Sequence, residues 1–463
     1  MSVAPPPEEG FDVTVPVLIV GAGACGLIAA LAAAEAGAEV LVVEADAVPA
    51  GSTALSAGLI PAAGTRAQAA AGIADDASLF AADLQRKAHG ESPQHLVDVM
   101  AARAGPTVDW LAARFGLPFT VVDDFDYPGH SRRRMHGLPS RAGRELVDRL
   151  RATCEAEGID IVCSRRARTL FAEGDRIAGV ALDGPEGEER IGCGALVLAC
   201  NGFGGNRDMV RRYTPEIENA VWFGHDGNTG DAIRWGAALG AGLKHLGAYQ
   251  GHGNVAHPHG ILITWAVIGA GGVQVNAGGR RFWNESQGYS EAARAVLAQP
   301  GGVAWAVFDA RIAAVARQFE DFKAAEAAGA ILTADAPGAL AAACGLPADA
   351  LAETLAAIPW GGTDGFGRRF GPVPLAPPYH AVKVTGALFH TQGGLDVTDG
   401  AQVRRPDGQV FPNLFAGGGA AVGVSGTGDS GYLSGNGLLS AAVLGRLAGR
   451  GAARAAAAGT TPT

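Results

Sequence analysis

Three glycines near the start of the chain have the type and spacing that bring a backbone close to a phosphate. They are Gly21, Gly23 and Gly26 of the segment GAGACG. The first permits a tight turn, the second lets the main chain approach a pyrophosphate, and the third lets a helix pack closely on a strand. The N–H groups at the start of the following helix favour a negatively charged group. This spacing predicts a dinucleotide-binding loop.

The elements around this loop are the ones that such a loop requires. Residues 15–20 form a β-branched apolar run, which is typical of a strand buried on both faces. Residues 27–36 are rich in Ala and Leu and predict a helix, and residues 39–43 predict a second buried strand that ends at Glu44. The Glu44 carboxylate can accept hydrogen bonds from ribose hydroxyls. This βαβ unit fits NAD and FAD equally well.

The segment after the second strand favours one of the two cofactors. Residues 51–58 are small and rich in hydroxyl groups, so they can approach a pyrophosphate and a flavin edge without crowding the ring. An ordinary glycine and serine turn is the alternative. We predict FAD, with contacts from Gly51, Ser52, Thr53, Ser56, Ala57 and Gly58.

The composition excludes several classes of protein. Of 463 residues, 48% are hydrophobic and 18% are charged, so the chain can bury a large core and is not intrinsically disordered. The formal net charge of −10 argues against a nucleic-acid or anionic-membrane partner. The six cysteines form no Cys-x-x-Cys pair and the histidines lack metal-ligand spacing, so we predict no metal site.

The N-terminal region bears on location. Residues 1–12 are acidic and proline-rich, which predicts a flexible tail and not a signal peptide. Residues 15–34 carry no charge over a length that can cross a bilayer, but the glycines inside this stretch favour the βαβ unit. The cysteine usage fits a reducing compartment. We predict a cytoplasmic protein without a membrane span.

Six segments in order along the chain resemble those of flavoproteins related to fumarate reductase and 3-ketosteroid dehydrogenase. The resemblance covers most of the chain, and it is nearer the branch that desaturates ketones. The segments are residues 196–206, 229–232, 272–276 with 279–285, 379–384 with 390–394, 414–419 and 434–439.

The resemblance implies an α/β fold with a discontinuous, Rossmann-like FAD-binding domain of the glutathione reductase type. This domain would comprise residues 13–240 and 371–463, with a smaller α+β cap domain inserted at 241–370. The glycine-rich residues 361–367 suggest a hinge at the second boundary. Family members that bind flavin covalently use a histidine near residue 52, and no histidine lies between 44 and 88, so we predict non-covalent FAD. The further cofactor contacts that the resemblance implies are Ala24, Cys25, Ala45, Ala167, Ala199, Cys200, Asn201, Gly202, Asp231, Gly418, Gly419, Asn436, Gly437 and Leu438.

The segments that carry the chemistry depart from the dicarboxylate reductases. The glutamate and arginine of their proton path are replaced by Trp265 and Ile268, and the arginine that delivers the proton is replaced by Tyr289. The arginine that clamps a substrate carboxylate is replaced by Tyr432. These losses argue against fumarate or succinate as the substrate.

Tyr289 instead resembles the tyrosine base of the 3-ketosteroid dehydrogenases, which takes the proton α to the ketone. By the same resemblance Tyr127 would assist it, and His380, Tyr379 or the Gly386 N–H would bind the carbonyl oxygen. A buried structural tyrosine is the alternative for each. Tyr432 is a further catalytic candidate. The remaining substrate-binding candidates are His252, Thr264, Trp265 and His390, of which the two histidines match residues that bind carboxylate in the reductases.

These observations predict an FAD-dependent dehydrogenase that introduces a C=C bond α,β to the carbonyl of a cyclic ketone. The substrate would be a 3-ketosteroid or a smaller cyclohexanone-type ketone such as 4-oxocyclohexanecarboxylate. One alternative is a C=C reductase of the fumarate or urocanate type, and another is a flavoprotein subunit that carries electrons. The electron acceptor is left open among O2, a quinone and an electron carrier. The densest basic cluster, residues 130–136, predicts a solvated loop, with a substrate-anion site as the alternative.

Overall fold

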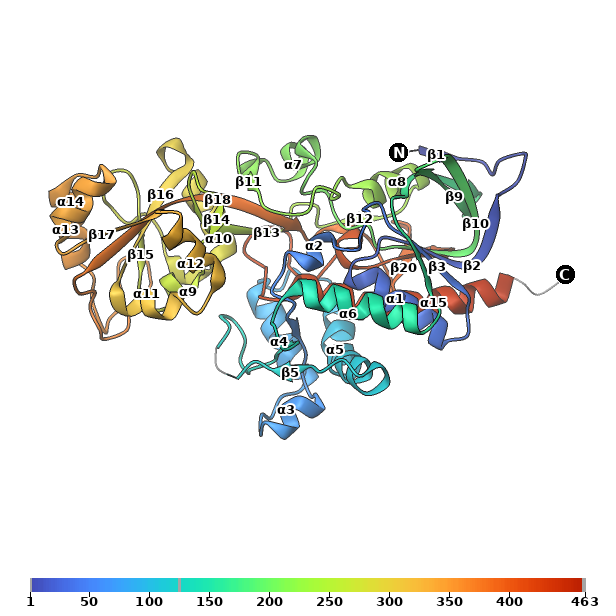
Figure 1. Ribbon diagram of the computed structural model, residues 1–463, viewed down its shortest axis with the longest axis horizontal. Coiled ribbons are helices and arrows are strands. Elements are labelled where there is room, and N and C mark those ends of the chain that lie inside the picture. The colour runs from blue at the N-terminus through green and yellow to red at the C-terminus, as the bar shows by residue number, and fades with distance from the viewer. Residues whose placement is uncertain (1, 124–125, 460–463) are drawn as a thin grey trace. The chain divides into compact units, whose positions relative to one another are not determined.

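The computed structural model describes residues 2–123 and 126–459, which form two compact units (Figure 1). Unit 1 comprises residues 1–213, 224–249 and 390–463, and unit 2 comprises residues 214–223 and 250–389. Each unit has a sheet and a hydrophobic core of its own.

The sheet of unit 1 has the order β1-β8-β9-β10-β2-β3-β7, and β21 adds to β10 with β20 beside it. β2 pairs in parallel with β10 and β3, and β10 pairs in parallel with β21, so the Rossmann-like architecture that the sequence predicts is confirmed. The strands are β1 (Ser2–Ala4), β2 (Val13–Val20), β3 (Val40–Val43), β7 (Asp160–Val162), β8 (Arg166–Glu173), β9 (Arg176–Gly184), β10 (Gly187–Leu198), β20 (Gln402–Arg404) and β21 (Val410–Ala416).

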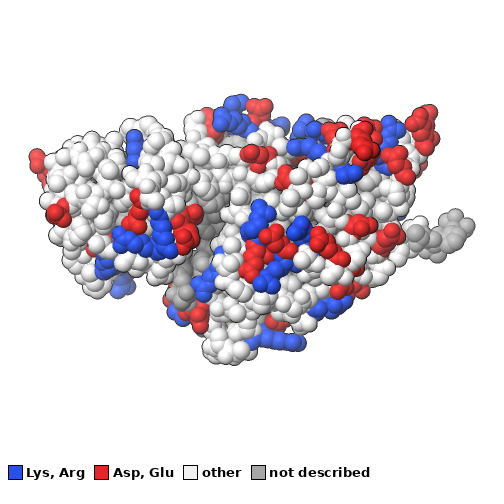
Figure 2. All heavy atoms as spheres, viewed as in Figure 1, with Lys and Arg blue, Asp and Glu red and all other residues white. Residues whose placement is uncertain are grey.

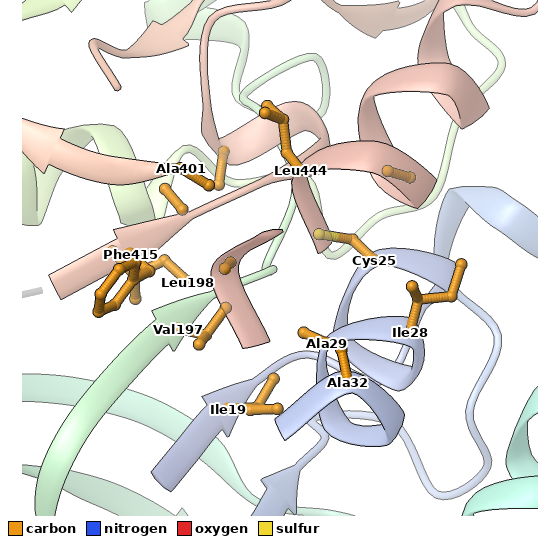
Figure 3. Packing of buried hydrophobic residues seen from close by; sticks show 14 of the residues in the cluster. Ile19, Cys25, Ile28, Ala29, Ala32, Val197, Leu198, Ala401, Phe415 and Leu444 are labelled. Atoms are coloured by element: carbon orange, nitrogen blue, oxygen red, sulfur yellow. The ribbon is translucent and has the colours of Figure 1, made fainter. Parts of the chain in front are cut away.

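Helices α1 (Ala24–Glu35) and α15 (Asn436–Gly459) lie side by side against this sheet. They approach so closely that a Cβ on Gly449 would lie 2.0 Å from the Ala29 carbonyl oxygen. Figure 3 shows side chains of α1, β10, β21 and α15 in the shared core, among them Ala29, Val197 and Phe415. This packing fixes where the N-termini of both helices lie in unit 1.

The remaining elements of unit 1 flank this sheet or form small sheets of two or three strands. They are α2 (Gly51–Ala54), β4 (Ile60–Pro61), α3 (Arg66–Ala70), α4 (Ala77–Lys87), α5 (Gln94–Phe115), β5 (Thr120–Val121), β6 (Met135–Gly137), α6 (Gly143–Ala156), α7 (Arg207–Tyr213), α8 (Asp231–Leu239), β12 (Leu243–Lys244), β19 (Gly394–Leu395) and the 3-10 turn η4 (Gly418–Ala420).

Unit 2 has a second sheet of order β14-β13-β18-β16-β15, with β11 and β17 also pairing with β18. Its strands are β11 (Val221–Trp222), β13 (Tyr249–Ala256), β14 (Ile261–Leu262), β15 (Val273–Val275), β16 (Val303–Asp309), β17 (Ile331–Ala334) and β18 (Tyr379–Thr391). Its helical elements are η1 (Pro215–Ile217), α9 (Ala266–Gly269), η2 (Glu285–Gln287), α10 (Tyr289–Leu297), η3 (Pro300–Gly302), α11 (Ala310–Ala316), α12 (Glu320–Ala327), α13 (Pro337–Cys344) and α14 (Ala348–Ala356).

Three segments differ from the sequence expectations. Ser2–Ala4 is not a free tail, because it forms β1 and pairs in parallel with β8. Residues 371–389 group with unit 2, because β18 pairs along its length with β16 and β17. Residues 361–367 lie within unit 2 and not at a unit boundary, and the half-buried Asp364 pairs there with Arg281.

The charge-free residues 15–34 are divided between β2 and α1. Within residues 2–123 and 126–459, no helix is both long enough and apolar enough to cross a membrane. The same residues hold no group of three or more His, Cys, Asp or Glu side chains arranged for a metal ion.

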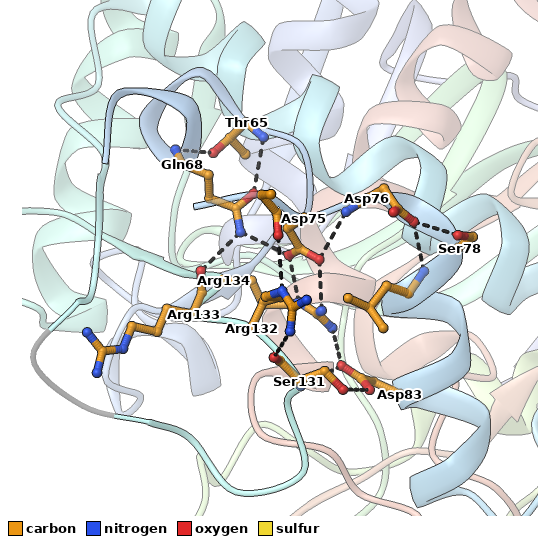
Figure 4. A network of polar contacts seen from close by, with 12 residues as sticks. Thr65, Gln68, Asp75, Asp76, Ser78, Asp83, Ser131, Arg132, Arg133 and Arg134 are labelled. Carbon is orange, nitrogen blue, oxygen red and sulfur yellow. Dashed lines mark hydrogen bonds and ion pairs between the residues drawn. The ribbon is translucent and has the colours of Figure 1, made fainter. Parts of the chain in front are cut away.

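The basic cluster at residues 130–136 is only partly solvated, contrary to the sequence expectation. Arg134 is fully buried and pairs with Asp75 at 2.9 Å and Asp83 at 2.7 Å (Figure 4). Arg132 and Arg133 are exposed, and Arg133 pairs with Asp126. On the face of the molecule in Figure 2, basic and acidic side chains are likewise interspersed.

Candidate active site

Two glycines of the loop after β2, Gly21 and Gly26, leave no room for a side chain. Gly21 has a φ of +106°, and a Cβ there would lie 2.6 Å from the Ala199 carbonyl oxygen. A Cβ on Gly26 would lie 1.8 Å from the carbonyl oxygen of Gly21. The turn and the first turn of α1 therefore depend on glycine at both positions, as the dinucleotide fingerprint requires.

The ends of β3 and α2 meet this loop through polar side chains. The Glu44 carboxylate accepts hydrogen bonds from the N–H of Ala22 at 2.6 Å and of Asp46 at 3.0 Å. The Thr53 hydroxyl oxygen accepts one from the Ala24 N–H at 3.1 Å. Residues 51–54 are thus a short helix that lies against the start of α1, and not a simple turn.

The return segment after β10 joins the same surface. Asn201 has a φ of +66° and donates from Nδ2 to the Ser52 hydroxyl at 2.7 Å. Asn228 donates to the same hydroxyl at 3.0 Å. A Cβ on Gly419 would lie 2.2 Å from Asn201 Oδ1, so η4 also lies directly against this segment. Non-glycine residues at positive φ cluster at functional sites, and asparagine is the residue type best suited to them.

Two buried oxygens on unit 1 show that this surface fits a ligand with hydrogen-bond donors. Asn436 Oδ1 at the start of α15 and Asp231 Oδ1 at the start of α8 are buried, and neither has a partner among the described residues. An FAD molecule carries hydroxyl and N–H donors, so these acceptors fit it. Of the predicted cofactor contacts, the structure joins those in the segments 21–26, 44–46, 51–58, 199–202 and 417–419 through the contacts above. Ala167 is buried on β8, and Gly437 and Leu438 follow Asn436 in α15.

On unit 2 the predicted base Tyr289 belongs to a stack of four parallel rings, called here the aromatic stack. Tyr289 stacks on His252 with ring centroids 5.2 Å apart, and His252 stacks on Phe389 at 5.5 Å. Phe389 in turn stacks on Phe223 at 5.0 Å, and the interplanar angles are 16–19° throughout. Trp265 meets His252 and Tyr289 edge-on.

His252 is held as a neutral imidazole of defined tautomer. The Asn254 N–H donates to His252 Nδ1 at 3.2 Å, so Nδ1 accepts and the ring hydrogen is on Nε2. Burial lowers the pKa of His252 to about 3. The side chain therefore offers one neutral hydrogen-bond donor at physiological pH.

Close packing of α10 on the sheet brings Tyr289 to His252. A Cβ on Gly253 would lie 2.3 Å from the Ala292 carbonyl carbon, and one on Gly386 would lie 2.6 Å from the Ala293 carbonyl oxygen. Gly251 donates its N–H to the Ser290 hydroxyl at 3.0 Å. Gly386, predicted as an oxyanion donor, thus has a packing reason to be glycine.

A buried ion cluster holds the segment that leads into Tyr289. Glu285 is fully buried and pairs with Arg281 and with Arg368 at 3.1 Å. Arg281 also pairs with Asp364. These charges compensate one another inside unit 2.

His390 and Tyr432 lie together on unit 1. Their rings meet edge-on with centroids 5.5 Å apart, and a Cβ on Gly437 would lie 3.2 Å from His390 Nε2. Burial lowers the pKa of His390 to about 4 and raises the pKa of Tyr432 to about 12. Both side chains are therefore neutral near pH 7.

The other predicted site residues have different surroundings. His380 packs on Phe308 and lies 2.8 Å from the Thr333 hydroxyl through Nδ1. Tyr379 precedes it and packs against the core of unit 2. Tyr127 packs against a small apolar cluster of unit 1 around Met135. Thr264 accepts a hydrogen bond from the Ala266 N–H at the start of α9.

Sequence reasoning missed Phe223 and Phe389 as members of the stack. The glycines on both sides of His252 were the available signal, because a Gly-His-Gly strand segment permits the close approach of a helix. The contact of Phe223 with Phe389 left no local signal, since it arises from the pairing of β11 with β18.

Comparison with known proteins agrees with this geometry. The sequence profile of a protein family described as an FAD binding domain matches residues 16–438. The chain belongs to this family. Among its relatives, the probable fumarate reductase Ifc3 of Shewanella frigidimarina is 32% identical over 98% of this chain and 76% of its own length. The 4-oxocyclohexanecarboxylate 2-dehydrogenase of Sinomonas cyclohexanicum is 25% identical over 98% of this chain and 97% of its own length.

A solved structure gives the same result at the level of fold. The open conformation of a flavocytochrome c3 fumarate reductase superimposes with a TM-score of 0.82 at 30% identity, covering 97% of this chain and 79% of that chain. This FAD-binding family member is an FAD-dependent oxidoreductase that acts on CH–CH bonds. The predicted preference for the ketone desaturase branch is not supported, because the named fumarate reductases share more sequence with the chain than the named ketone dehydrogenase does.

Proposed function

We propose that this protein reduces the C=C bond of an α,β-unsaturated carboxylate, with Tyr289 as proton donor and His252 as hydrogen-bond donor to the carboxylate oxygen. The observation that carries the proposal is the stacking of Tyr289 on a neutral His252. The direction of the reaction is supported by the relatives, of which Ifc3 is named a probable fumarate reductase.

The residues divide the chemistry between them. Once it has been reduced, bound FAD would supply a hydride equivalent to one carbon of the double bond. The Tyr289 hydroxyl delivers a proton to the other carbon, a task that positioned acids accelerate by about 10²–10⁴-fold. The His252 Nε2–H donates to the oxygen on which negative charge develops, and a fixed neutral donor is effective there because it needs no reorganisation.

The charge of the stack restricts the substrate. Its four rings are uncharged, and the neighbouring Arg281 and Arg368 are already paired with Glu285. A dicarboxylate needs more than one compensating cation, whereas a single carboxylate can be held by neutral donors. The flat faces of Tyr289 and Trp265 suit a planar apolar group. We therefore propose a monocarboxylate with a planar or cyclic remainder.

A second candidate, the desaturation of a cyclic ketone, is favoured by Tyr289 itself. The segment Asn284–Ser286 followed by Tyr289 resembles the base segment of the 3-ketosteroid dehydrogenases. The relative named 4-oxocyclohexanecarboxylate 2-dehydrogenase matches almost the whole chain, although at lower identity. In that direction Tyr289 accepts the α-proton and His252 stabilises the enolate oxygen. The electron acceptor for this direction stays open among O2, a quinone and an electron carrier.

Anaerobic flavin spectroscopy separates the two candidates. The protein is purified with FAD, reduced with dithionite, and mixed with fumarate, an aryl-substituted acrylate or cyclohexenone. We expect the aryl acrylate to reoxidise the flavin fastest. In the opposite experiment the oxidised protein is mixed with succinate, cyclohexanone or 4-oxocyclohexanecarboxylate. Bleaching by the ketones, with no reoxidation by acrylates, would replace the first candidate by the second.

A further inference from the structure

In unit 1 a series of hydrogen bonds through three buried side chains leads from Asn436 of α15 to the half-buried His390. Asn436 Nδ2 lies 2.9 Å from the Ser425 hydroxyl, which lies 2.7 Å from Gln392 Oε1. Gln392 Nε2 lies 3.0 Å from His390 Nδ1. Gln392, Ser425 and Asn436 are 5%, 1% and 0% exposed, so water does not compete for these bonds.

The donor and the acceptor of every hydrogen bond in this series of side chains follow from its first member, Asn436. The Asn436 amide also faces the Val424 carbonyl oxygen at 3.4 Å, and a carbonyl only accepts, so the facing atom is the amide nitrogen. Ser425 accepts from Asn436 and therefore gives its single hydrogen to Gln392 Oε1. This leaves the Gln392 amide nitrogen to donate to His390 Nδ1.

The opposite orientation of the Gln392 amide is unfavourable at the Ser425 hydroxyl. If the Gln392 amide were reversed, its nitrogen and that of Asn436 would both donate to the Ser425 hydroxyl. The Ser425 hydrogen would then lose its buried acceptor, which costs about 1–3 kcal/mol. The other polar neighbour of His390 Nδ1 is the Thr391 carbonyl oxygen at 3.5 Å, the limit of a hydrogen bond.

We propose that Gln392 and Ser425 are positioning residues that hold His390 as the neutral tautomer with its hydrogen on Nε2. His390 then presents one directed donor, as His252 does on unit 2. The two histidines reach this state by different means. A backbone N–H fixes the tautomer of His252, whereas hydrogen-bonded side chains fix the tautomer of His390. The use of this donor on a substrate carboxylate rests on the proposed function, whereas the tautomer does not.

The tautomer can be measured in the FAD-loaded protein labelled with ¹⁵N-histidine, by two-bond ¹⁵N–¹H correlation at pH 7. His252 and His136 give internal references of opposite kind. His136 Nδ1 donates to the Arg134 carbonyl at 2.9 Å, while its Nε2 faces the Thr65 hydroxyl at 2.7 Å, so it carries hydrogen on Nδ1. Substitution of each histidine by Gln assigns its signal. We expect the His390 pattern to match His252, and a match to His136 would overturn the proposal.

Two variants test the role of the hydrogen-bonded side chains of Gln392 and Ser425. In Gln392→Glu the carboxylate only accepts, so His390 should gain hydrogen on Nδ1 while His252 and His136 are unchanged. In Ser425→Ala the Gln392 amide loses its orientation, and His390 should show a mixture of tautomers. An unchanged single Nε2–H pattern in either folded variant would contradict the proposal. If the pattern changes but the KM and kcat of Gln392→Glu do not, the positioning inference stands and the proposed use of His390 in the reaction fails.

Discussion

The cofactor-binding surface of unit 1 and the aromatic stack of unit 2 are built by opposite means. On unit 1 the surface is made of backbone, at positions such as Gly21 and Gly26 where a Cβ would collide with a carbonyl oxygen. On unit 2 it is made of ring faces, with Tyr289 stacked on His252 and His252 on Phe389.

This difference determines which changes each region tolerates. The surface of unit 1 has no space for an added methyl group at Gly21 and Gly26, whereas its polar contacts are distributed over several segments of the chain. The stack of unit 2 keeps its packing when one polar atom is removed, but that atom carries the proposed chemistry. The two regions should therefore respond differently to mutation, the cofactor-binding surface by losing structure and cofactor, and the aromatic stack by losing turnover alone.

The largest effect is expected for Gly26→Ala. The new Cβ would lie 1.8 Å from the Gly21 carbonyl oxygen, and backbone atoms on both sides leave little room to relax. We expect a loss of about 3 kcal/mol or more in the free energy of unfolding, together with loss of bound FAD. FAD content per chain and urea unfolding measure both. Gly338→Ala is the matched control, because a Cβ there meets no atom within 4 Å. Normal FAD content in Gly26→Ala would contradict the backbone account.

Tyr289→Phe should keep the stack and lose the reaction. The ring stays while its oxygen is removed, so FAD content and unfolding should match the wild type. We expect kcat to fall by about 10²–10⁴-fold, the range for loss of a general acid or base. The matched control is Tyr213→Phe, whose ring packs on Phe203 in unit 1. Stopped-flow measurement of flavin reoxidation gives the rate, and an unchanged rate in Tyr289→Phe would remove this residue from the mechanism.

The same contrast explains which parts of the molecule could be predicted from the sequence. Only glycine avoids a collision with the backbone at positions 21 and 26, so the spacing of Gly21, Gly23 and Gly26 identified the βαβ unit that the structure confirms. Clusters of side chains from distant parts of the sequence have no comparable spacing pattern. Arg134 was predicted in a solvated loop because its partners Asp83 and Asp75 are 51 and 59 residues away in sequence.

On unit 2, alignment with the family could not predict the contacts of the site residues. It placed His380 at the position of an oxyanion donor, which stays a prediction, and strand pairing sets that side chain beside Phe308 and Thr333. The resemblance could supply a residue type at a position in the sequence. It could not supply the tertiary packing that decides what the side chain contacts.

Glu285→Gln tests whether the ion cluster supports unit 2 separately from the cofactor surface. The change leaves Arg368 buried without its carboxylate, and removing one partner of a buried pair costs about 3–5 kcal/mol. Tryptophan fluorescence during urea unfolding should show this loss, because five of the seven tryptophans lie in unit 2. Glu353→Gln removes an exposed pair with Arg280 in the same unit and should cost about 1 kcal/mol or less. Equal losses in the two variants would show that burial of the cluster has no energetic role.

The smallest effect concerns the dependence of stability on pH. His252 has a folded-state pKa of about 3 against an ordinary value of 6.5, so between these values the unfolded chain binds a proton that the folded chain does not. Its contribution to stability is therefore complete above pH 6.5 and decreases as the pH falls, by at most about 1.4 kcal/mol per pH unit. His252→Phe keeps a ring in the stack without this titration, so unfolding of unit 2 should become less sensitive to pH between 6.5 and 5. Unit 1 should keep its sensitivity, because burial lowers the pKa of His136 and of His390 to about 4. If the variant loses stability on acidification as steeply as the wild type, burial does not lower the folded-state pKa of His252 and does not keep this ring neutral below pH 6.5.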